Sequence, residues 1–569
     1  MNLNIKAQPD MTYDAIVIGS GVSGGWAAKE LTEKGLRVLM LERGRPLEHI
    51  TGYEEAMKTP WEASEKARLG GLDRKYPQVR QDTSPTDSPA GYWMAGAEKS
   101  YRQDKPFRWM RPDIVGGKSI MWGRQSYRLG DLDFEANAKD GIGVDWPIRY
   151  KDIAPWYSYV EKFAGISGEK LGLPQLPDGD FLPPMEMYFV EKEVRKHIEK
   201  NFPGRIMTVG RSANLSQAQA VHQDNGRASC QYRDRCGHGC PYGAYFSTQS
   251  CTLPPAVRTG RLTLRPHSVV AEVLYDAQRQ RASGVRVVDA VTLESREYFA
   301  GIIFVCASAM ASTALLLNSV SGRFPNGMGN DSEQLGHNLM DHHFHIGASG
   351  RWEGGEDRYY YGRRANGIYI PRYRNIGTDK RDYLRGFGYQ GGGGRQGWQR
   401  RVAELSFGAS LKEELTAPGQ WDMGLVAFGE QLPDYKNRLY LDKTQPDKWG
   451  MPTVVFDAEF GENEKKMRVD MLNDAKEMLE SAGLVGVHGY DNGAISGGAI
   501  HEMGTARMGR DPKTSVLNGF NQMHAVKNVF VTDGACMTSS ACQNPSLTYM
   551  ALTARAADFA VRERKARRL

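Results

Sequence analysis

Long apolar runs are missing from this sequence of 569 residues, in which no stretch of about 18 consecutive apolar residues occurs. A transmembrane helix is therefore not expected. Apolar residues make up 40% of the chain and charged residues 25%, which is an ordinary composition for a soluble globular protein. A chain of this length can bury a large core, and we expect two domains.

A concentration of charge of one sign is also missing. The net charge is only +6, and the basic residues are scattered apart from residues 562–568, which we interpret as a solvated helix end. No basic stripe accompanies the Arg- and Tyr-rich tract 355–400, which argues against a nucleic-acid partner. The glycine run 391–394 in this tract predicts a mobile loop over an active site or a strand pair that lines it. Tyr389 and Gln390 are candidate substrate contacts.

Cysteine is scarce, and three of the seven cysteines lie close together. Cys230, Cys236 and Cys240 form a Cys-x5-Cys-x3-Cys-Pro run. An odd total cannot all pair as disulfides, and zinc would need a fourth ligand, for which His238 is awkwardly spaced. A proline after the last cysteine is typical of many iron–sulfur ligand runs. The residues alone leave a cluster site, a structural loop, a zinc site and a disulfide open.

A glycine-rich turn near the N-terminus predicts a dinucleotide site. Residues 13–18 form a predicted buried strand that runs into Gly19-Ser20-Gly21-Val22-Ser23-Gly24, and a helical pattern follows until Gly35. In such a unit Gly19 allows the tight turn, Gly21 lets the backbone approach a pyrophosphate, and Gly24 permits close helix–strand packing. A second predicted strand, residues 36–41, stops at Glu42, which can accept hydrogen bonds from a ribose diol.

Other segments favour FAD over NAD as the dinucleotide. Residues 115–123 form a small-residue loop that lets backbone N–H groups approach a flat ring or a phosphate. Residues 304–309 and 529–534 resemble further strands, ending in small residues and in Asp533-Gly534.

Together these landmarks resemble, in order and over nearly the full length, the glucose–methanol–choline (GMC) oxidoreductase superfamily. The matching stretches are the N-terminal fingerprint, Gly116-Gly117-x-Ser119-x-x-Trp122, Asp145-Trp146-Pro147-Ile148, residues 336–342, His501-x-x-Gly504-Thr505, Asp533-Gly534 and Asn544-Pro545-x-x-Thr548. The resemblance implies an α/β FAD-binding Rossmann-like domain interleaved with an α+β substrate-binding domain. We place the FAD domain at residues 11–125, 250–335 and 495–569, and the substrate domain, with the cysteine-rich loop, at residues 126–249 and 336–494.

The resemblance also assigns roles to particular residues. His501 would take the hydroxyl proton, Asn544 would hydrogen-bond the same oxygen, and hydride would pass to flavin N5. A histidine titrates near neutral pH and is the usual general base. Met121 stands where some relatives carry a linking histidine, so FAD is expected to be non-covalent. The predicted cofactor-binding residues are Gly19, Ser20, Gly21, Gly24, Glu42, Arg43, Gly116, Gly117, Ser119, Trp122, Gly123, Val270, Ala307, Asp533, Gly534, Asn544, Pro545 and Thr548.

The cysteine run is similar to that of bacterial FAD-dependent glucose and glucoside dehydrogenase subunits. That similarity implies a [3Fe–4S] cluster on Cys230, Cys236 and Cys240 that takes electrons from the flavin. His337, His342, His343 and His345 also resemble a metal site, but they belong to a stretch that is structural in the family.

The resulting prediction is a dehydrogenase that oxidises a secondary ring hydroxyl of a sugar or glycoside, foremost C3 of glucosides. Electrons would pass through the cluster to a cytochrome or quinone. A gluconate 2-dehydrogenase-like or other alcohol dehydrogenase subunit, an oxygen-using sugar oxidase, a lyase on the same flavin fold and a subunit without a substrate of its own are the alternatives.

The compartment stays open at this stage. Residues 1–6 lack an apolar h-region and a twin arginine, so no export signal is expected in the chain itself. Related bacterial subunits are exported folded, together with a small helper subunit that bears the signal. The expected location is therefore the periplasm, by such co-export, or the cytoplasm.

Overall fold

The structure is a computed structural model that describes residues 12–53, 56–58, 101–360, 362–397, 408–416 and 419–569. Residues 1–6, on which the prediction about export depends, lie outside this part of the chain. Within it, no helix combines the length and the apolar character that a membrane crossing needs.

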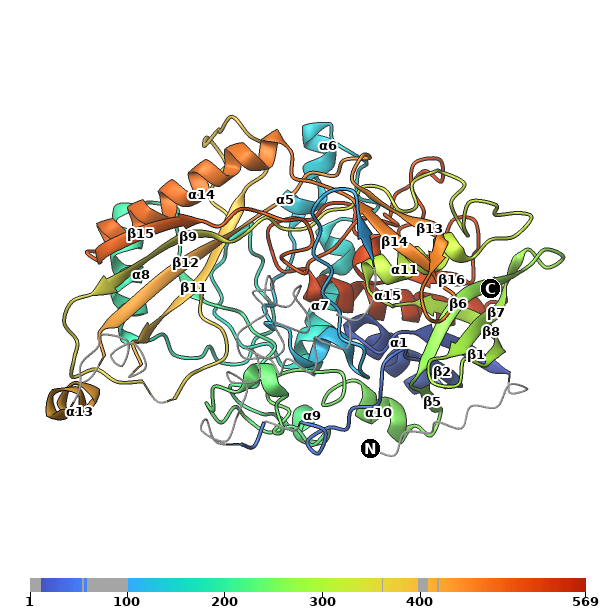
Figure 1. Ribbon diagram of the computed structural model, residues 1–569, viewed down its shortest axis with the longest axis horizontal. Helices are drawn as coiled ribbons and strands as arrows, with labels where there is room; N and C mark the ends of the chain where they lie inside the picture. Colours follow the sequence, from blue (N-terminus) through green and yellow to red (C-terminus); the bar gives the residue numbers. More distant parts are fainter. Residues whose placement is uncertain (1–11, 54–55, 59–100, 361, 398–407, 417–418) are drawn as a thin grey trace.

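A mixed sheet of seven strands in the described chain forms one end of the molecule (Figure 1). Its strands are β1 (Tyr13–Ile18), β2 (Val38–Leu41), β5 (Leu262–Arg265), β6 (Ser268–Asp276), β7 (Arg281–Asp289), β8 (Ser295–Val305) and β16 (Val529–Val531). The order is β5-β2-β1-β8-β7-β6, with β16 also paired to β8. Strands β5, β2, β1, β8 and β16 run parallel, whereas β6 and β7 add an antiparallel edge. The carboxyl ends of the parallel strands therefore meet at one edge.

Helices bury the apolar residues of this sheet. Helix α1 (Val22–Glu33) follows β1 directly and packs beside α15 (Ser546–Lys565) and α10 (Leu253–Arg258). Its Ala27, Ala28 and Leu31 share a core with alternate residues of β1 and β2. Further helices are α5 (Asp131–Phe134), α6 (Ala136–Asp140), α7 (Tyr150–Ala164), α9 (Ala220–Gln223) and α11 (Ala309–Asn318).

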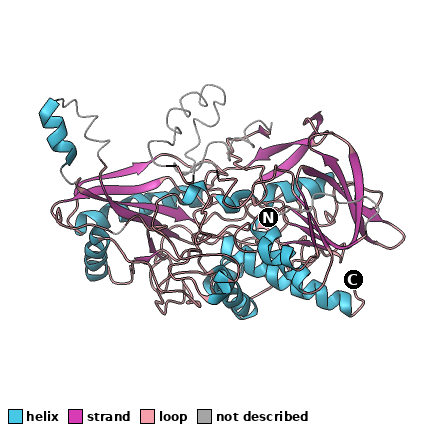
Figure 2. Cartoon of the chain, turned by 90° about the horizontal axis from the view of Figure 1, so that it is seen from below, coloured by secondary structure: helices cyan, strands magenta, loops and turns pink. Residues whose placement is uncertain are grey.

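A second sheet of six antiparallel strands forms the opposite end of the molecule, as the view from below shows (Figure 2). Its order is β15 (Val485–Asp491), β9 (Ile346–Trp352), β12 (Trp421–Gly429), β11 (Phe387–Arg395), β10 (Ile368–Ile370) and β4 (Thr208–Val209). Helices α8 (Phe189–Asn201) and α14 (Glu462–Ser481) pack against it, and α13 (Gly408–Thr416) lies at its periphery. A small third sheet joins β13 (Arg438–Pro446), β14 (Pro452–Asp457) and β3 (Arg102–Gln103).

The two large sheets draw their strands from different parts of the sequence. Every strand of the seven-stranded sheet falls in a segment predicted for the FAD domain, and every strand of the six-stranded sheet falls in a segment predicted for the substrate domain. The third sheet joins segments of both kinds. The boundaries themselves stay predictions. The glycine run 391–394 forms part of β11, so it belongs to a strand pair and not to a loop.

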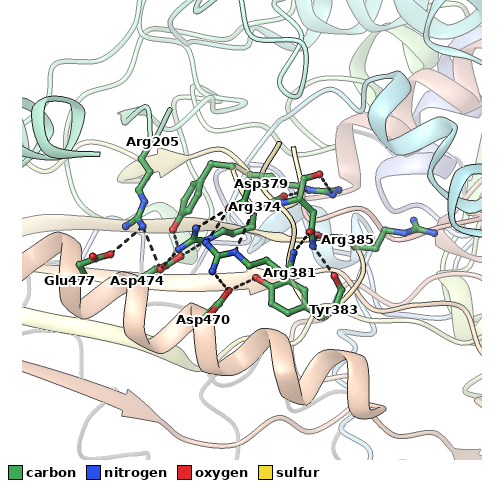
Figure 3. Close-up of polar contacts among 12 residues, drawn as sticks. Arg205, Arg374, Asp379, Arg381, Tyr383, Arg385, Asp470, Asp474 and Glu477 are labelled. Atoms are coloured by element: carbon green, nitrogen blue, oxygen red, sulfur yellow. Dashed lines mark hydrogen bonds and ion pairs between the residues drawn. The ribbon is translucent and has the colours of Figure 1, made fainter. Parts of the chain in front are cut away.

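A network of charges attaches the chain before β11 to α14 (Figure 3). Asp474 accepts hydrogen bonds from Arg374 at 2.6 and 2.8 Å and from the hydroxyl of Tyr373 at 2.8 Å. Arg205 approaches the same carboxylate at 3.5 Å and binds Glu477 at 3.1 Å. The Asp474 side chain is only 6% exposed, whereas that of Glu477 is 55% exposed.

Removing the buried carboxylate of Asp474 is expected to lower the free energy of unfolding strongly. Asp474→Ala leaves Arg374 without its main partner, and breaking a buried ion pair in this way costs about 3–5 kcal/mol. Glu477→Ala is the matched control on the same helix and should change the free energy of unfolding by less than about 1 kcal/mol. Urea unfolding of both variants measures the difference, and equal midpoints would contradict this role of Asp474.

A second buried carboxylate links α5 to the segment before Asn544. One oxygen of Asp133 accepts hydrogen bonds from the Gly130 N–H at 2.9 Å and from the Gln543 amide at 3.1 Å. Burial, reinforced by the charge of Glu430, raises the pKa of Asp133 to about 7. The folded state therefore binds this proton more tightly than the unfolded state does, and ionisation of Asp133 destabilises the fold as the pH rises from about 4 through 7.

Asp133→Asn is expected to stabilise the protein at pH 8. The asparagine oxygen can keep both hydrogen bonds while the buried charge disappears, which is worth up to about 4 kcal/mol for a shift of about three pKa units. The gain should shrink as the pH falls below 7 and vanish near pH 4. Thermal melting of both proteins between pH 5 and 8 tests this, and a gain that does not depend on pH would contradict it.

Candidate active site

A cavity of 630 Å³ begins at the carboxyl ends of β1, β2 and β8 and reaches the six-stranded sheet. Gly19, Ser20 and Gly21 line one end of it. His501, Asn544, Gln390 of β11 and Phe428 of β12 line it at the other sheet. The carboxyl edge of a parallel sheet is the usual place for a nucleotide in this type of fold.

The glycine turn has the shape that a pyrophosphate needs. Gly19 has φ +97°, and a Cβ added to it would lie 2.4 Å from the carbonyl oxygen of Cys306. A Cβ on Gly24 would lie 1.9 Å from the carbonyl oxygen of Gly19, so only glycine permits this helix–strand contact. Helix α1 begins after Gly21 without a side-chain cap, and its first turn contains no acidic residue. Its N–H groups and the positive end of its dipole are thus available to an anion.

Gly21 provides a direct test of whether a dinucleotide fits. It has φ −67° and ψ −166°, an extended conformation that any residue can adopt, and a Cβ there would meet no atom within 4 Å. The protein fold does not require glycine at this position. The space over Gly21 belongs to the cavity, so the absence of a side chain serves whatever occupies it. This shape fits the pyrophosphate of FAD.

Two predicted cofactor residues hold the protein together as well. Glu42 accepts hydrogen bonds from the backbone and hydroxyl of Ser20, at 3.1 and 2.6 Å, and from the Gly44 N–H at 2.8 Å. Ser20 in turn accepts from the Gly116 N–H at 2.8 Å, which ties the 116–119 loop to the glycine turn. Glu42 still lines the cavity, at the position expected for a ribose ligand.

The structure brings most of the predicted cofactor residues to this one cavity. Those that line it are Gly19, Ser20, Gly21, Glu42, Arg43, Gly117, Ser119, Trp122, Gly123, Val270, Ala307, Asp533, Gly534, Asn544 and Pro545. Gly24, Gly116 and Thr548 do not line it. Gly24 serves the helix–strand contact, and the Thr548 hydroxyl is buried against that of Tyr157 at 2.7 Å. Their placement indicates a supporting role and not direct contact with a ligand.

His501 and Asn544 converge at the cavity although 43 positions separate them in the sequence. The Asn544 amide nitrogen lies 3.3 Å from Nε2 of His501, and the Asn544 oxygen accepts from the Gln390 amide at 2.6 Å. On its other side, Nδ1 of His501 lies 2.9 Å from Nδ1 of His342. Burial, together with the neighbouring His342 imidazole and the charge of Lys118, holds the pKa of His501 well below its usual value. The ring is therefore neutral near pH 7, as a general base must be.

The backbone before His501 is strained and held in place. Ile500 has φ +62°, a left-handed conformation that β-branched residues rarely adopt. The carboxylate of Asp341 accepts hydrogen bonds from the backbone N–H groups of the two residues that flank Ile500, Ala499 and His501, both at 3.0 Å. Burial and the nearby Glu502 raise the pKa of Asp341 to about 7. This clamp holds the backbone from which the His501 side chain projects.

Comparison with known proteins matches this arrangement to one family. The model of the GMC oxidoreductase N-terminal region matches residues 13–344, and that of the C-terminal region matches residues 433–553. The chain belongs to the GMC oxidoreductase family. As a family member it is an FAD-binding oxidoreductase that acts on CH–OH groups.

Several curated GMC relatives are similar over nearly the whole chain. A 2-methyl-1,2-propanediol dehydrogenase of Mycolicibacterium austroafricanum is 28% identical, covering 96% of this chain and 94% of the relative. The fructose dehydrogenase large subunit of Gluconobacter japonicus is 25% identical, covering 98% and 99%. Paromamine 6'-oxidase of Streptomyces fradiae is 26% identical, covering 96% and 91%. Among solved structures, pyridoxine 4-oxidase from Mesorbium loti superposes with a TM-score of 0.60 at 17% identity, covering 96% and 98%, which confirms the fold.

The cavity of this GMC oxidoreductase is lined by both amide and aromatic side chains. Gln125, Asn366 and Gln390 contribute amides to the cavity. Phe344 and Phe428 also line it, and their rings stack at 5.1 Å with an angle of 18°. Tyr389 and Gln390 were both expected to contact a substrate. Gln390 lines the cavity, whereas Tyr389 does not: it is buried and donates its hydroxyl to the Met471 carbonyl at 2.7 Å.

The three clustered cysteines lie on one loop but do not form a metal site in the described structure. Cys230 and Cys240 pack beside Leu215, and Cys236 begins a short 3₁₀ helix, Cys236–His238. All three are free thiols, and burial and the neighbouring thiols raise the pKa of Cys236 to about 12. Among the described residues, no three His, Cys, Asp or Glu side chains are grouped so that they could hold a metal ion. The iron–sulfur cluster therefore stays a prediction.

Two residues beside His501 and Asn544 were not predicted to take part in the site. His342 contacts His501, and Asp341 clamps the backbone around it, yet both belong to a stretch interpreted as structural. The remaining histidines of that stretch do not reach the site together: His337, for example, stacks on Tyr435. A buried histidine next to an aspartate was the available signal, but nothing in the sequence linked it to position 501.

Proposed function

We propose that the protein is an FAD-dependent dehydrogenase that oxidises a secondary ring hydroxyl of a sugar or glycoside, with C3 of glucosides as the foremost position. The observation that carries the proposal is the pair formed by His501 and Asn544, whose Nε2 and amide nitrogen lie 3.3 Å apart at the wall of the cavity. A hydroxyl oxygen between them can accept from the amide while its proton faces the imidazole.

Each side chain has a distinct task in this proposal. Asn544 donates a hydrogen bond to the substrate oxygen, and Gln390 keeps the Asn544 amide turned the right way by donating to its oxygen. His501, which is neutral and half-buried, takes the hydroxyl proton at Nε2. When bound, FAD supplies the two-electron acceptor for the hydride that leaves the carbinol carbon. Gly19, Gly21 and Glu42 would hold it at the far end of the cavity.

The lining of the cavity supports a neutral, polyhydroxylated substrate. Three amides can bind several hydroxyls, and the two stacked phenylalanines offer an apolar surface to the C–H face of a sugar ring. The cations near this end are already engaged: Lys118 pairs with Glu502 at 3.0 Å, and Arg124 donates to carbonyls such as that of Phe246 at 2.8 Å. A sugar acid would lack a ready partner for its carboxylate, which favours a glycoside over gluconate.

The test is a substrate panel under anaerobic conditions. Methyl glucosides, fructose, gluconate and simple diols are added to the holoenzyme with an artificial electron acceptor, and the product is identified by NMR. We expect turnover of methyl glucoside to a 3-keto product and little turnover of gluconate. Preferred oxidation of gluconate or of a diol would overturn the substrate assignment while keeping the oxidoreductase. In a parallel assay in air, oxygen consumption at a similar rate would identify an oxidase.

We further propose that Cys230, Cys236 and Cys240 bind a [3Fe–4S] cluster, which would supply a one-electron carrier toward a cytochrome or quinone. Two observations support it: the thiols gather on one loop, and Arg124, which lines the cavity, lies close enough to Cys236 and Cys240 for their charges to act on it. Iron and acid-labile sulfide are measured in protein purified without oxygen. Three irons per chain, lost in Cys236→Ser, are expected; an iron-free active enzyme would leave the loop structural.

A further inference from the structure

His342 lies behind His501, on the side away from the substrate position, in a chain of hydrogen bonds with one fixed end. Its Nε2 lies 2.9 Å from the carbonyl oxygen of Ala541. A carbonyl oxygen can only accept a hydrogen bond, so Nε2 of His342 carries the hydrogen. His342 is buried, and burial lowers its pKa to about 4, so its ring is neutral near pH 7.

The hydrogen on Nε2 of His342 determines which nitrogen carries the hydrogen at each later step of this hydrogen-bond chain. A neutral imidazole has a single N–H, so Nδ1 of His342 bears only a lone pair and must accept. Its neighbour at 2.9 Å is Nδ1 of His501, which therefore carries the hydrogen of that ring. Nε2 of His501 is then the bare nitrogen, and it faces the Asn544 amide, a donor, at 3.3 Å.

We propose that His342 is a positioning residue that fixes the tautomer of His501, so that the bare Nε2 of His501 always faces the substrate hydroxyl. The inference rests on the proposed function in one respect, namely that His501 is the base. The other tautomer would point an N–H at the substrate hydroxyl and could not take its proton. It would also set two lone pairs against each other between the ring of His501 and the buried ring of His342.

The Ala541 carbonyl is well placed to anchor this chain. Ala541 has φ +54°, and the chain on either side of it is buried. The backbone bend presents its oxygen to His342 only three residues before Asn544. One short segment thus supplies both the fixed end of the hydrogen-bond chain and the amide that meets its other end.

Two substitutions of His342 distinguish a role in positioning His501 from a role in packing alone. In His342→Gln the amide carries an acceptor and a donor in place of Nδ1 and Nε2, so the tautomer of His501 is kept. In His342→Leu a similar volume is filled but the acceptor is gone, and the buried Nδ1–H of His501 loses its partner. We expect His342→Leu to lower kcat by roughly 10- to 100-fold with KM little changed, and His342→Gln to recover most of that loss.

The kcat of both variants is compared with that of the wild-type holoenzyme. The FAD content and the melting temperature of all three proteins are measured as well and should be equal. Equal kcat in His342→Leu and wild type would overturn the proposal, and so would an equally impaired His342→Gln. Should neither variant fold, a neutron crystal structure of the deuterated wild-type holoenzyme decides. It should show deuterium on Nδ1 of His501 and none on Nε2, and the reverse pattern overturns the inference. The neutron result does not need a substrate, so it remains decisive even if no alcohol is oxidised and the proposed function fails.

Discussion

We expect His501→Ala to lower kcat by about 10³-fold, within the range of about 10² to 10⁴ that a positioned general base contributes. His501 presents its Nε2 at the cavity wall, and its hydrogen-bond partner there is the Asn544 amide, which cannot take a proton in its place. Steady-state kinetics with a saturating alcohol substrate and an artificial acceptor measures the effect.

Two controls accompany the His501→Ala variant: its FAD content and a substitution of a second histidine, His337. FAD should stay bound, because the glycine turn that we expect to hold the pyrophosphate lies at the other end of the cavity. His337→Ala removes a histidine that stacks on Tyr435, away from the site, and should leave kcat within about twofold, since a surface substitution changes little. Turnover that survives His501→Ala would show that another group is the base.

Gly21→Val is expected to weaken FAD binding by about 100-fold without disturbing the apoprotein. The valine side chain meets no protein atom near Cβ and can adopt the extended backbone of this position, but it fills the space over the turn. Overpacking of that kind costs about 1–3 kcal/mol, and each 1.4 kcal/mol is a factor of ten in affinity. Fluorescence titration of the apoprotein with FAD gives the dissociation constant.

Gly322→Val is a matched control for this substitution. Gly322 is exposed, and a Cβ there also meets nothing within 4 Å, but it lies outside the cavity. Its affinity for FAD and its circular dichroism should equal those of the wild type. Unchanged FAD affinity in Gly21→Val would contradict the placement of the pyrophosphate over this turn.

The dinucleotide half of the site could be predicted because its signals are local. Residues 13–42 specify strand, turn, helix and strand by continuous patterns, and the structure has β1, α1 and β2 there. Each glycine of the turn has a physical requirement that is visible in the sequence spacing. Only the start of the second strand differs from the prediction. The strand begins at Val38 instead of Leu36, because Leu36 and Arg37 complete the turn after Gly35.

The catalytic half could be predicted only in part, because its contacts are long-range. His501 meets His342 across 159 positions, and Asn544 meets Gln390 across 154. No periodicity or motif encodes such a pairing. The first follows from the antiparallel pairing of β9 with β15 and from the bridge between Met340 and Met503. Thr548 shows the opposite case, since it lies in a recognised motif, yet the start of α15 turns its hydroxyl to Tyr157.

An anaerobic titration of the holoenzyme with methyl glucoside, in which the visible absorbance of the flavin is followed, tests most directly whether His501 drives the oxidation of a glycoside. We expect rapid loss of that absorbance in the wild type, and loss slowed by about 10³-fold in His501→Ala at equal FAD content. No loss of absorbance with the glycoside or with any other alcohol of the panel would contradict it, as would an equally fast loss in the variant.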